Sequence, residues 1–281
     1  MQNQSEVQYK IYATLLDAWQ DYLDTPQIYD KYWGYSNEPP HTLEEFWAKQ
    51  HASLIDRINR VPFTSEAASK GTAFNAVIDT LITGQLDEKV KMSKVLDENG
   101  KPSAVQAELD GFTFRFPFEI CKEFALYYKG AIPQVRVSAI LPTGFGNVEL
   151  YGYIDELLPL SVHDIKTTGN YSASKFKHHS QHLVYPYCLI QNDSNVRTFE
   201  YNVAEESKSG KWQTFTETYV FDPDRDIPIL RERCEGFIEF LLQNLQFITD
   251  RKIFGGENPD GYVGEPIDIN KLTQAKYGNM V

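Results

Sequence analysis

Two adjacent extended segments constrain the fold of this chain more than any other feature. Residues 147–155 and 161–168 are rich in Val, Ile, Leu and Tyr, and the short stretch Leu157-Leu158-Pro159-Leu160 connects them. A connection this short suits two antiparallel strands. Successive side chains of a strand point to opposite faces, so Lys166 shares a face with Asp164 two positions earlier, while the residue between them turns into the core. The sequence therefore predicts a hairpin that presents a carboxylate and an ammonium on one surface.

A second carboxylate, Asp155, ends the first of these segments. If the hairpin register sets Asp155 beside Asp164, two hard oxygen ligands converge on a site that suits Mg²⁺ or Mn²⁺, and the main-chain carbonyl of Ile165 offers a third oxygen. Such an ion acidifies its bound water and neutralises charge on a phosphodiester, while Lys166 would orient or deprotonate that water or hold the scissile phosphate. An isolated Asp-x-Lys pair also fits a solvated surface ion pair, worth about 0–1 kcal/mol.

Three ordered motifs together resemble a known family. Gly152-Tyr153-Ile154-Asp155, then Asp164-Ile165-Lys166-Thr167-Thr168, then Gln181 and Tyr185 resemble the core signature of the PD-(D/E)XK nuclease superfamily, in particular its RecB-like exonuclease branch. Recognisable motifs span roughly residues 70–220.

The resemblance implies a role for each matched residue. Asp155 and Asp164 would be metal ligands, Lys166 the catalytic lysine, and Gln181 with Tyr185 catalytic groups that shape the site or contact phosphate. On a helix, positions four apart lie on one face, so the last two residues are expected to point the same way, with Pro186 ending the regular helix after Tyr185. A Gln and a Tyr on one helical face are often structural, but their distance from the lysine favours function.

An upstream segment, residues 70–79, resembles the helical first motif of the same branch, in which Gly-x-x-x-His is usual. This chain has Asn75 where the histidine would fall, and Asn75 and Asp79 are expected to share a helix face. An amide oxygen can ligate a hard cation, although more weakly than imidazole ligates Mn²⁺. Asn75 is therefore the remaining candidate metal ligand.

Charge is unevenly distributed along the chain. Lys and Arg number 27 against 39 Asp and Glu, giving a net charge of −12, which argues against broad non-specific attraction to nucleic acid. Yet residues 165–192 contain no acidic residue, where even mixing would give about four. Lys175, Lys177, His178 and Tyr171 lie there and are candidates for neutralising phosphates and stacking on bases. A mobile basic loop without a ligand is the alternative.

Spacing of apolar residues predicts an α/β fold with a central mixed β-sheet flanked by helices. The resemblance implies that this is a restriction-endonuclease-like core. We expect one nuclease domain over residues 1–281, with helical additions at both ends. Its parts are a helical N-terminal cover (1–64), a catalytic core (65–221), and a closing helix with an irregular tail (222–281). The expected elements are helices at 8–24, 42–60, 65–81, 117–128, around 181 and at 224–251, a hairpin or surface excursion at 89–111, and strands at 134–141, 147–155, 161–168, 197–204 and 212–221.

These features predict a divalent-metal-dependent DNA nuclease, with exonuclease activity favoured, acting in replication, recombination, repair or phage DNA processing. One alternative is a catalytically inactive module of the same fold that binds nucleic acid or protein. Another is a restriction-type endonuclease, which would need a base-reading element that we do not find. The chain has no Walker A motif, so unwinding of DNA would require a helicase or recombination partner protein.

Cysteine content and hydropathy give further expectations. Cys121, Cys188 and Cys234 are odd in number and far apart, which fits buried thiols of a reduced protein and not the four-cysteine set of an iron-sulphur cluster. No stretch reaches the roughly 20 apolar residues of a membrane helix, and the first residues lack an export signal. We therefore expect a cytoplasmic protein without membrane contact.

Overall fold

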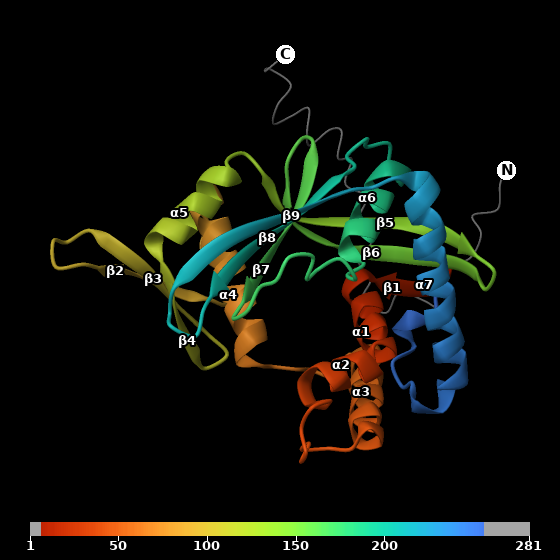
Figure 1. Cartoon of the computed structure of the whole chain (residues 1–281). Helices are drawn as coiled ribbons and strands as arrows, with labels where there is room; N and C mark the ends of the chain where they lie inside the picture. The colour runs from red at the N-terminus through yellow and green to blue at the C-terminus, as the bar shows by residue number, and fades with distance from the viewer. Residues whose placement is uncertain (1–6, 256–281) are drawn as a thin grey trace.

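The computed structural model describes residues 7–255 as a mixed central sheet with helices on both faces and a small antiparallel sheet beside it (Figure 1). This confirms the predicted fold class. The central sheet contains β1 (Val7–Tyr12), β5 (Ile132–Thr143), β6 (Gly146–Leu157), β7 (Ser161–Thr168), β8 (Thr198–Glu206) and β9 (Trp212–Val220). The small sheet contains β2 (Lys91–Leu96), β3 (Pro102–Leu109) and β4 (Phe112–Pro117).

Strand β6 lies at the centre of the sheet, and two neighbouring strands share one of the two edges of β6. Along one edge it pairs antiparallel with β5 over its whole length. On the other edge, residues 147–151 pair in parallel with β1, whereas β7 pairs with β6 only through Glu156–His163 and Leu157–Val162. Within the described chain, residues 152–155 have no bridge partner on this edge. We call this opening of the sheet the fork.

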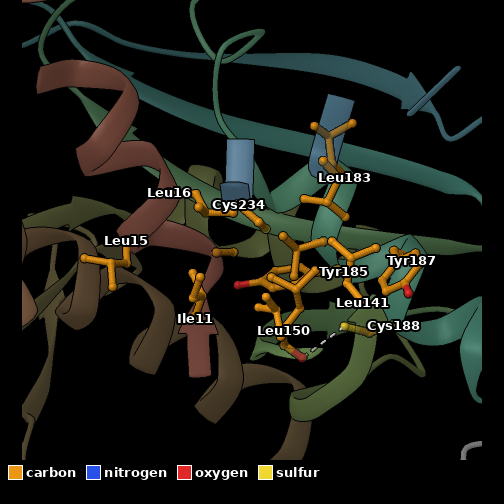
Figure 2. Close-up of a cluster of buried hydrophobic side chains, with 14 of the residues drawn as sticks. Ile11, Leu15, Leu16, Leu141, Leu150, Leu183, Tyr185, Tyr187, Cys188 and Cys234 are labelled. Carbon is orange, nitrogen blue, oxygen red and sulfur yellow. Dashed lines mark hydrogen bonds between the residues drawn. The ribbon is translucent and has the colours of Figure 1, made fainter. Parts of the chain in front are cut away.

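One face of the sheet is covered by α1 (Ala13–Leu23), α6 (Gln181–Gln191) and α7 (Pro223–Gln243). Figure 2 shows the apolar side chains between these helices and the sheet, including Leu150 of β6 and Leu183 of α6. The Cys188 thiol donates to the Leu150 carbonyl at 3.5 Å. Helices α2 (Thr25–Trp33) and α3 (Leu43–Ile58) pack outside α1 (Figure 1).

The opposite face carries α4 (Glu66–Thr83), α5 (Phe118–Tyr127) and the small sheet, with a second core between them. Ile165 of β7 is buried in this second core. Asp164 and Lys166 therefore face the α6 side of the sheet, as the alternation of strand side chains predicts. The fork thus lies between α4 on one face and α6 on the other.

Most predicted elements are confirmed, including the hairpin of β6 with β7 and the helix beginning at Thr42. There the Thr42 hydroxyl accepts from the Glu45 N–H at 3.2 Å, and the Glu45 carboxylate accepts from the Thr42 N–H at 2.9 Å. The three cysteines are free and buried, as expected. Within residues 7–255, every helix falls short of the length or continuous apolar character that a bilayer crossing requires.

Several expectations about element boundaries are wrong. The helix predicted from residue 8 starts at Ala13, because residues 7–12 alternate between buried and exposed positions and pair with β6 as a strand. Strand β4 and helix α2 were not expected, and the closing helix ends at Gln243 and is followed by short 3-10 turns. An irregular tail was predicted from Gly255 onward. Apart from Gly255 itself, this tail lies outside the described residues.

Helix α6 continues through Pro186 to Gln191, so the prediction that Tyr185 ends it is wrong. Proline has no N–H, so the carbonyl of His182 loses its helical partner. Residues 181–189 are all buried, however. Burial of so many side chains stabilises the helix by more than one missing hydrogen bond costs.

Gly152, at the fork, is required by the packing of Tyr185. A Cβ atom at residue 152 would lie 2.5 Å from Cε1 of the Tyr185 ring and 3.0 Å from its hydroxyl oxygen. That ring is itself buried. Glycine at this position lets the α6 tyrosine lie directly against β6.

We predict that Gly152→Ala lowers the free energy of unfolding by about 1–3 kcal/mol, because the new methyl group overpacks a rigid site. Gly71→Ala, inside α4, is the matched control. A Cβ atom at residue 71 would lie 3.5 Å from the Thr167 hydroxyl, which is an ordinary contact. That variant should gain about 0.5–1 kcal/mol of stability from its better helix propensity. Denaturant unfolding of both variants measures the contrast, and equal effects would contradict this account of Gly152.

Candidate active site

Asp164, Lys166 and Gln181 form a closed triangle on the α6 side of the fork. The Lys166 ammonium lies 2.7 Å from Oδ2 of Asp164 and donates to Oε1 of Gln181 at 2.9 Å. The Gln181 amide nitrogen donates in turn to Oδ1 of Asp164. The Asp164 side chain is 4% exposed, whereas Lys166 is 24% exposed. The lysine is therefore held in one direction, and its side chain is less deeply buried than that of Asp164.

Asp155 reaches the same place from β6. Continuing the β6–β7 register by one position sets Asp155 opposite Asp164. Oδ2 of Asp155 accepts the main-chain N–H of Ile165 at 2.8 Å and the side-chain amide of Asn75 at 3.1 Å. These two bonds hold Asp155 across the fork to β7 and to α4.

The electrostatics of this cluster favour an additional positive charge. Burial, and after it the negative charge of Asp164, raises the pKa of Asp155 to about 8 against the opposing effect of Lys166. Burial lowers the pKa of Lys166, but the two carboxylates outweigh burial, and the net result is a raised pKa that keeps the ammonium charged. Two carboxylates thus face one ammonium in a poorly solvated site, which a bound cation would neutralise.

The donor set fits a hard divalent ion that retains several waters. Within residues 7–255, no group of three or more His, Cys, Asp and Glu side chains is arranged to hold a metal. The site offers instead the two carboxylates Asp155 and Asp164, with the amide of Asn75 beside them. This amide faces Asp155 with its nitrogen, and its buried oxygen has no hydrogen-bond partner in the described chain, so exchanging the two ends of the amide would turn that oxygen toward the carboxylates. Mg²⁺ commonly binds through one or two carboxylates and keeps its remaining waters.

Two buried tyrosines close the α6 side of the cluster. The Gln181 amide donates to the hydroxyl of Tyr185 at 3.4 Å, as expected of two residues on one helical face. Tyr201 of β8, which sequence reasoning missed, places its ring 5.7 Å from the Lys166 ammonium. A cation near an aromatic face is stabilised by the ring quadrupole. Both rings are buried, and the ring of Tyr201 covers the lysine on its inner side.

Three further carboxylates near the site were also missed as site groups. Asp17 of α1 accepts the N–H of Ser180, the residue before α6. Asp79 of α4 shares a hydrogen bond with buried Glu156, and its charge contributes to the raised pKa of Asp155. For Asp79 and Glu156, the only sequence signal was the expected common face of Asn75 and Asp79. Nothing in the sequence connects Asp17 to Ser180, which lies 163 positions later.

The predicted nucleic-acid contacts lie in the irregular segment 169–180 between β7 and α6. The Lys175 ammonium is used internally, donating to the Thr168 hydroxyl and the Asn170 carbonyl, each at 2.7 Å. The ring of Tyr171 stacks on Phe215 with a 4.4 Å centroid separation. Lys177 and His178 are exposed. Two of the four residues are thus directed toward solvent, and two stabilise the segment.

Acidic side chains from outside the segment compensate for its lack of acids. The Glu205 carboxylate accepts the N–H of Tyr171 at 2.7 Å, and Glu217 accepts the N–H of Lys175 at 3.0 Å. Arg233 of α7 adds bonds to the carbonyls of His178 and His179. The absence of acids in residues 165–192 therefore does not leave a bare basic loop.

Two histidines near the start of α6 are held in neutral form. Burial, together with nearby cations, lowers the pKa of His182 to about 3 and that of His179 to about 4. The His182 ring stacks on Tyr219 with a 4.4 Å centroid separation, and its Nδ1 has no hydrogen-bond partner in the described chain. Protonation of His182 would therefore place an unsatisfied charge in the core.

We predict that His182 makes the protein less stable in mild acid. The folded pKa lies below the unfolded value of about 6.5, so this contribution to stability is complete above pH 6.5 and is lost as the pH falls toward 3. His182→Phe keeps the stacked ring and removes the titration. Between pH 7 and 4.5, the wild type should lose roughly 2 kcal/mol more unfolding free energy than this variant.

Chemical denaturation across this pH range provides the measurement. The control is His178→Gln, because His178 is exposed and its removal should leave the pH profile of the wild type unchanged. Parallel profiles for the wild type and His182→Phe would contradict the assignment of a buried neutral imidazole.

Comparisons with known proteins show only remote structural similarity. No protein-family model and no curated protein matches this sequence. Among solved structures, one match is the protein named SSO0001. The match covers 86% of this chain and 80% of SSO0001, at 10% identity and a TM-score of 0.40. A protein named "Putative exonuclease" from Eubacterium rectale matches 82% of this chain with 81% of its own, at 13% identity and a TM-score of 0.33. Similarity at this level is distant and assigns neither family nor activity.

Proposed function

We propose that this protein is a divalent-metal-dependent DNA nuclease that acts as an exonuclease. The observation that carries the proposal is the convergence of Asp155, Asp164 and Lys166 at the fork. Two strands and two helices from distant parts of the sequence hold these groups together, although the burial of two carboxylates opposes folding. Such a cost is typical of a functional site rather than of a structural ion pair.

Each residue has a distinct proposed role. Asp155 and Asp164 would hold Mg²⁺ or Mn²⁺, with the side-chain oxygen of Asn75 and the main-chain carbonyl of Ile165 as further ligands. The ion, when bound, supplies an acidified water and neutralises phosphate charge. Lys166, directed by its 2.7 Å and 2.9 Å contacts, would donate to a phosphate oxygen or to the attacking water.

Gln181 and Tyr185 would act by positioning. Gln181 contacts both Asp164 and Lys166, so it fixes the distance between a proposed ligand and the proposed catalytic lysine. Tyr185 supports Gln181 and packs on Gly152, which ties the triangle to β6. Small displacements of such groups cost large factors in rate, because near-attack geometry is lost.

DNA would approach from the exposed side of segment 169–180. Lys177 and His178 would contact phosphates there, while Lys175 and Tyr171 would support the segment and its outer surface. The resemblance to RecB-like enzymes favours attack on DNA ends during replication, recombination, repair or phage DNA processing. A helicase or recombination protein would supply any unwinding.

Cleavage assays test this proposal. With Mg²⁺ or Mn²⁺, the wild type should degrade linear DNA, and Asp155→Ala, Asp164→Ala and Lys166→Ala should each lower the rate by about 10²–10³, the usual loss when one preorganised electrostatic group is removed. The chain contains a matched control at Asp87 and Lys89, which have the same spacing but are exposed in a loop before β2. Asp87→Ala and Lys89→Ala should retain full activity.

Retained cleavage in Asp164→Ala and Lys166→Ala would remove the proposal, because the assigned groups would then be dispensable. Circular DNA separates the two nuclease modes, since an exonuclease leaves it intact and a restriction-type endonuclease yields discrete fragments.

A catalytically inactive binding module is the second candidate, favoured by Asn75 at the position of the usual histidine and by the absence of a three-residue metal cluster in the described chain.

Metal binding distinguishes the two candidates. For a nuclease, we predict that Mn²⁺ raises the melting temperature of the wild type but not that of Asp155→Asn, and that calorimetry detects the same difference. Without metal at pH 7, Asp155→Asn should be at least as stable as the wild type, because it removes a carboxylate that burial disfavours. A module without metal chemistry would show no Mn²⁺ effect in either protein.

A further inference from the structure

A cavity of about 540 Å³ lies beyond the α6 side of the fork, between segment 169–180, β9 and the first turns of α7. Its size is within the range of ordinary ligand sites. It is joined to the candidate active site through α6, because His182 lines the cavity while the preceding residue, Gln181, contacts Asp164 and Lys166. The two sites are thus held by consecutive residues of one helix.

The walls of this cavity are basic on one side and apolar on the other. Three permanently charged cations line it, and Asp226 is the only acidic residue among its described lining residues. The cations are Lys177, Arg225 and Arg233, the histidines are His178 and His182, and the apolar residues are Leu183, Tyr219, Val220, Phe221 and Ile229. A basic cavity is notable in a chain with a net charge of −12.

The single carboxylate is already neutralised. Arg225 donates from Nε to Oδ1 of Asp226 at 2.7 Å and from Nη2 to Oδ2 at 2.8 Å, and the Asp222 N–H also donates to Oδ2. A carboxylate engaged on both oxygens in this way offers little charge to a ligand. The remaining excess in the cavity is therefore positive.

Hydrogen-bond donors remain available on the basic side. Arg233 donates through Nη1 to the His178 and His179 carbonyls and to the Ser180 hydroxyl, which leaves its Nε and Nη2 without a protein acceptor within residues 7–255. Lys177 is exposed at the rim and is not used by any side-chain bond in the described chain.

We propose that this cavity binds one nucleotide of the substrate strand, outside the position that is cleaved. Its phosphate would lie against Lys177 and Arg233, and its base or sugar against the apolar wall formed by β9 and α7. The proposal rests on the proposed nuclease function and adds a second point of attachment for the strand. A strand fixed there would be aligned toward the fork, because one helix connects both places.

Binding of DNA without metal tests the cavity separately from catalysis. A fluorescently labelled single-stranded oligodeoxynucleotide is titrated in EDTA and followed by anisotropy. Lys177→Glu should weaken binding by about fivefold or more. The slope of the logarithm of the binding constant against the logarithm of salt concentration should fall by about one, as expected for the loss of one phosphate contact. Lys177→Gln should have an intermediate effect, and Lys177→Arg should bind like the wild type.

The matched control is Lys208→Glu, which makes the same charge change at an exposed lysine before the opposite end of β9. It should leave binding unchanged, and circular dichroism should show all variants folded. Equal weakening by Lys177→Glu and Lys208→Glu would mean that only total charge matters and would overturn the proposal. Unchanged binding in Lys177→Glu would overturn it as well.

A second arm separates a strand site from a site for free anion. Inorganic phosphate, titrated alone by calorimetry, should bind far more weakly than the oligonucleotide, because it lacks the base and sugar. Binding of phosphate as tight as that of the oligonucleotide would contradict a nucleotide site. If Asp164→Ala loses cleavage while Lys177→Glu binds DNA like the wild type, the proposed function stands and only this inference is removed. If Asp164→Ala still cleaves DNA while Lys177→Glu binds it weakly, the binding cavity stands and the proposed function is removed.

Discussion

The divided edge of β6 is the constraint on which the rest of the structure depends. A strand that paired with one neighbour along its whole edge would cover residues 152–155 with a continuous ladder. Here β1 ends at Tyr12, and β7 leaves β6 after two bridged pairs, so neither strand covers this stretch. Side chains from helices on both faces fill the opening, which is why groups from α4, β6, β7 and α6 meet at one point.

The contents of the fork are electrostatically unfavourable in the absence of a ligand. Asp155 and Asp164 repel one another in a medium that solvates neither well, and Lys166 compensates for only one of them. The surrounding fold tolerates this through specific neutral donors, the Ile165 N–H and the amides of Asn75 and Gln181. A protein under selection for stability alone would place apolar side chains here, so the retained charges support the proposed role of the site.

Sequence reasoning predicted the parts of this site that depend on local periodicity. The two-residue alternation of β7 correctly set Asp164 and Lys166 on one face, and the four-residue spacing of α6 set Gln181 beside Tyr185. Contacts made across the fold had no such signal. Tyr201 comes from a strand beyond a crossover helix, and its only mark in the sequence is one aromatic residue in an alternating segment.

Local rules also failed where packing outweighed them. Proline at position 186 favours a helix end, but the buried environment of α6 on every side keeps the helix regular to Gln191. Tyr9 matches a helical spacing with Tyr12 as well as an alternation with Ile11, and the choice depends on β6, whose paired residues lie about 140 positions later. The acid-free window 165–192 indicated a basic surface, but Glu205 and Glu217 from neighbouring strands occupy part of it.

The pairing of β1 with β6 also bears on how the chain reaches its native state. Val7 lies beside Asn147, so this ladder closes a loop of about 140 residues, one of the most entropically demanding steps in folding. During synthesis, β1 would leave the ribosome long before its partner exists, and until then its unpaired edge would be open to other chains. The strand that limits one side of the fork is thus expected to dock late, after the hairpins of β5, β6 and β7 have assembled.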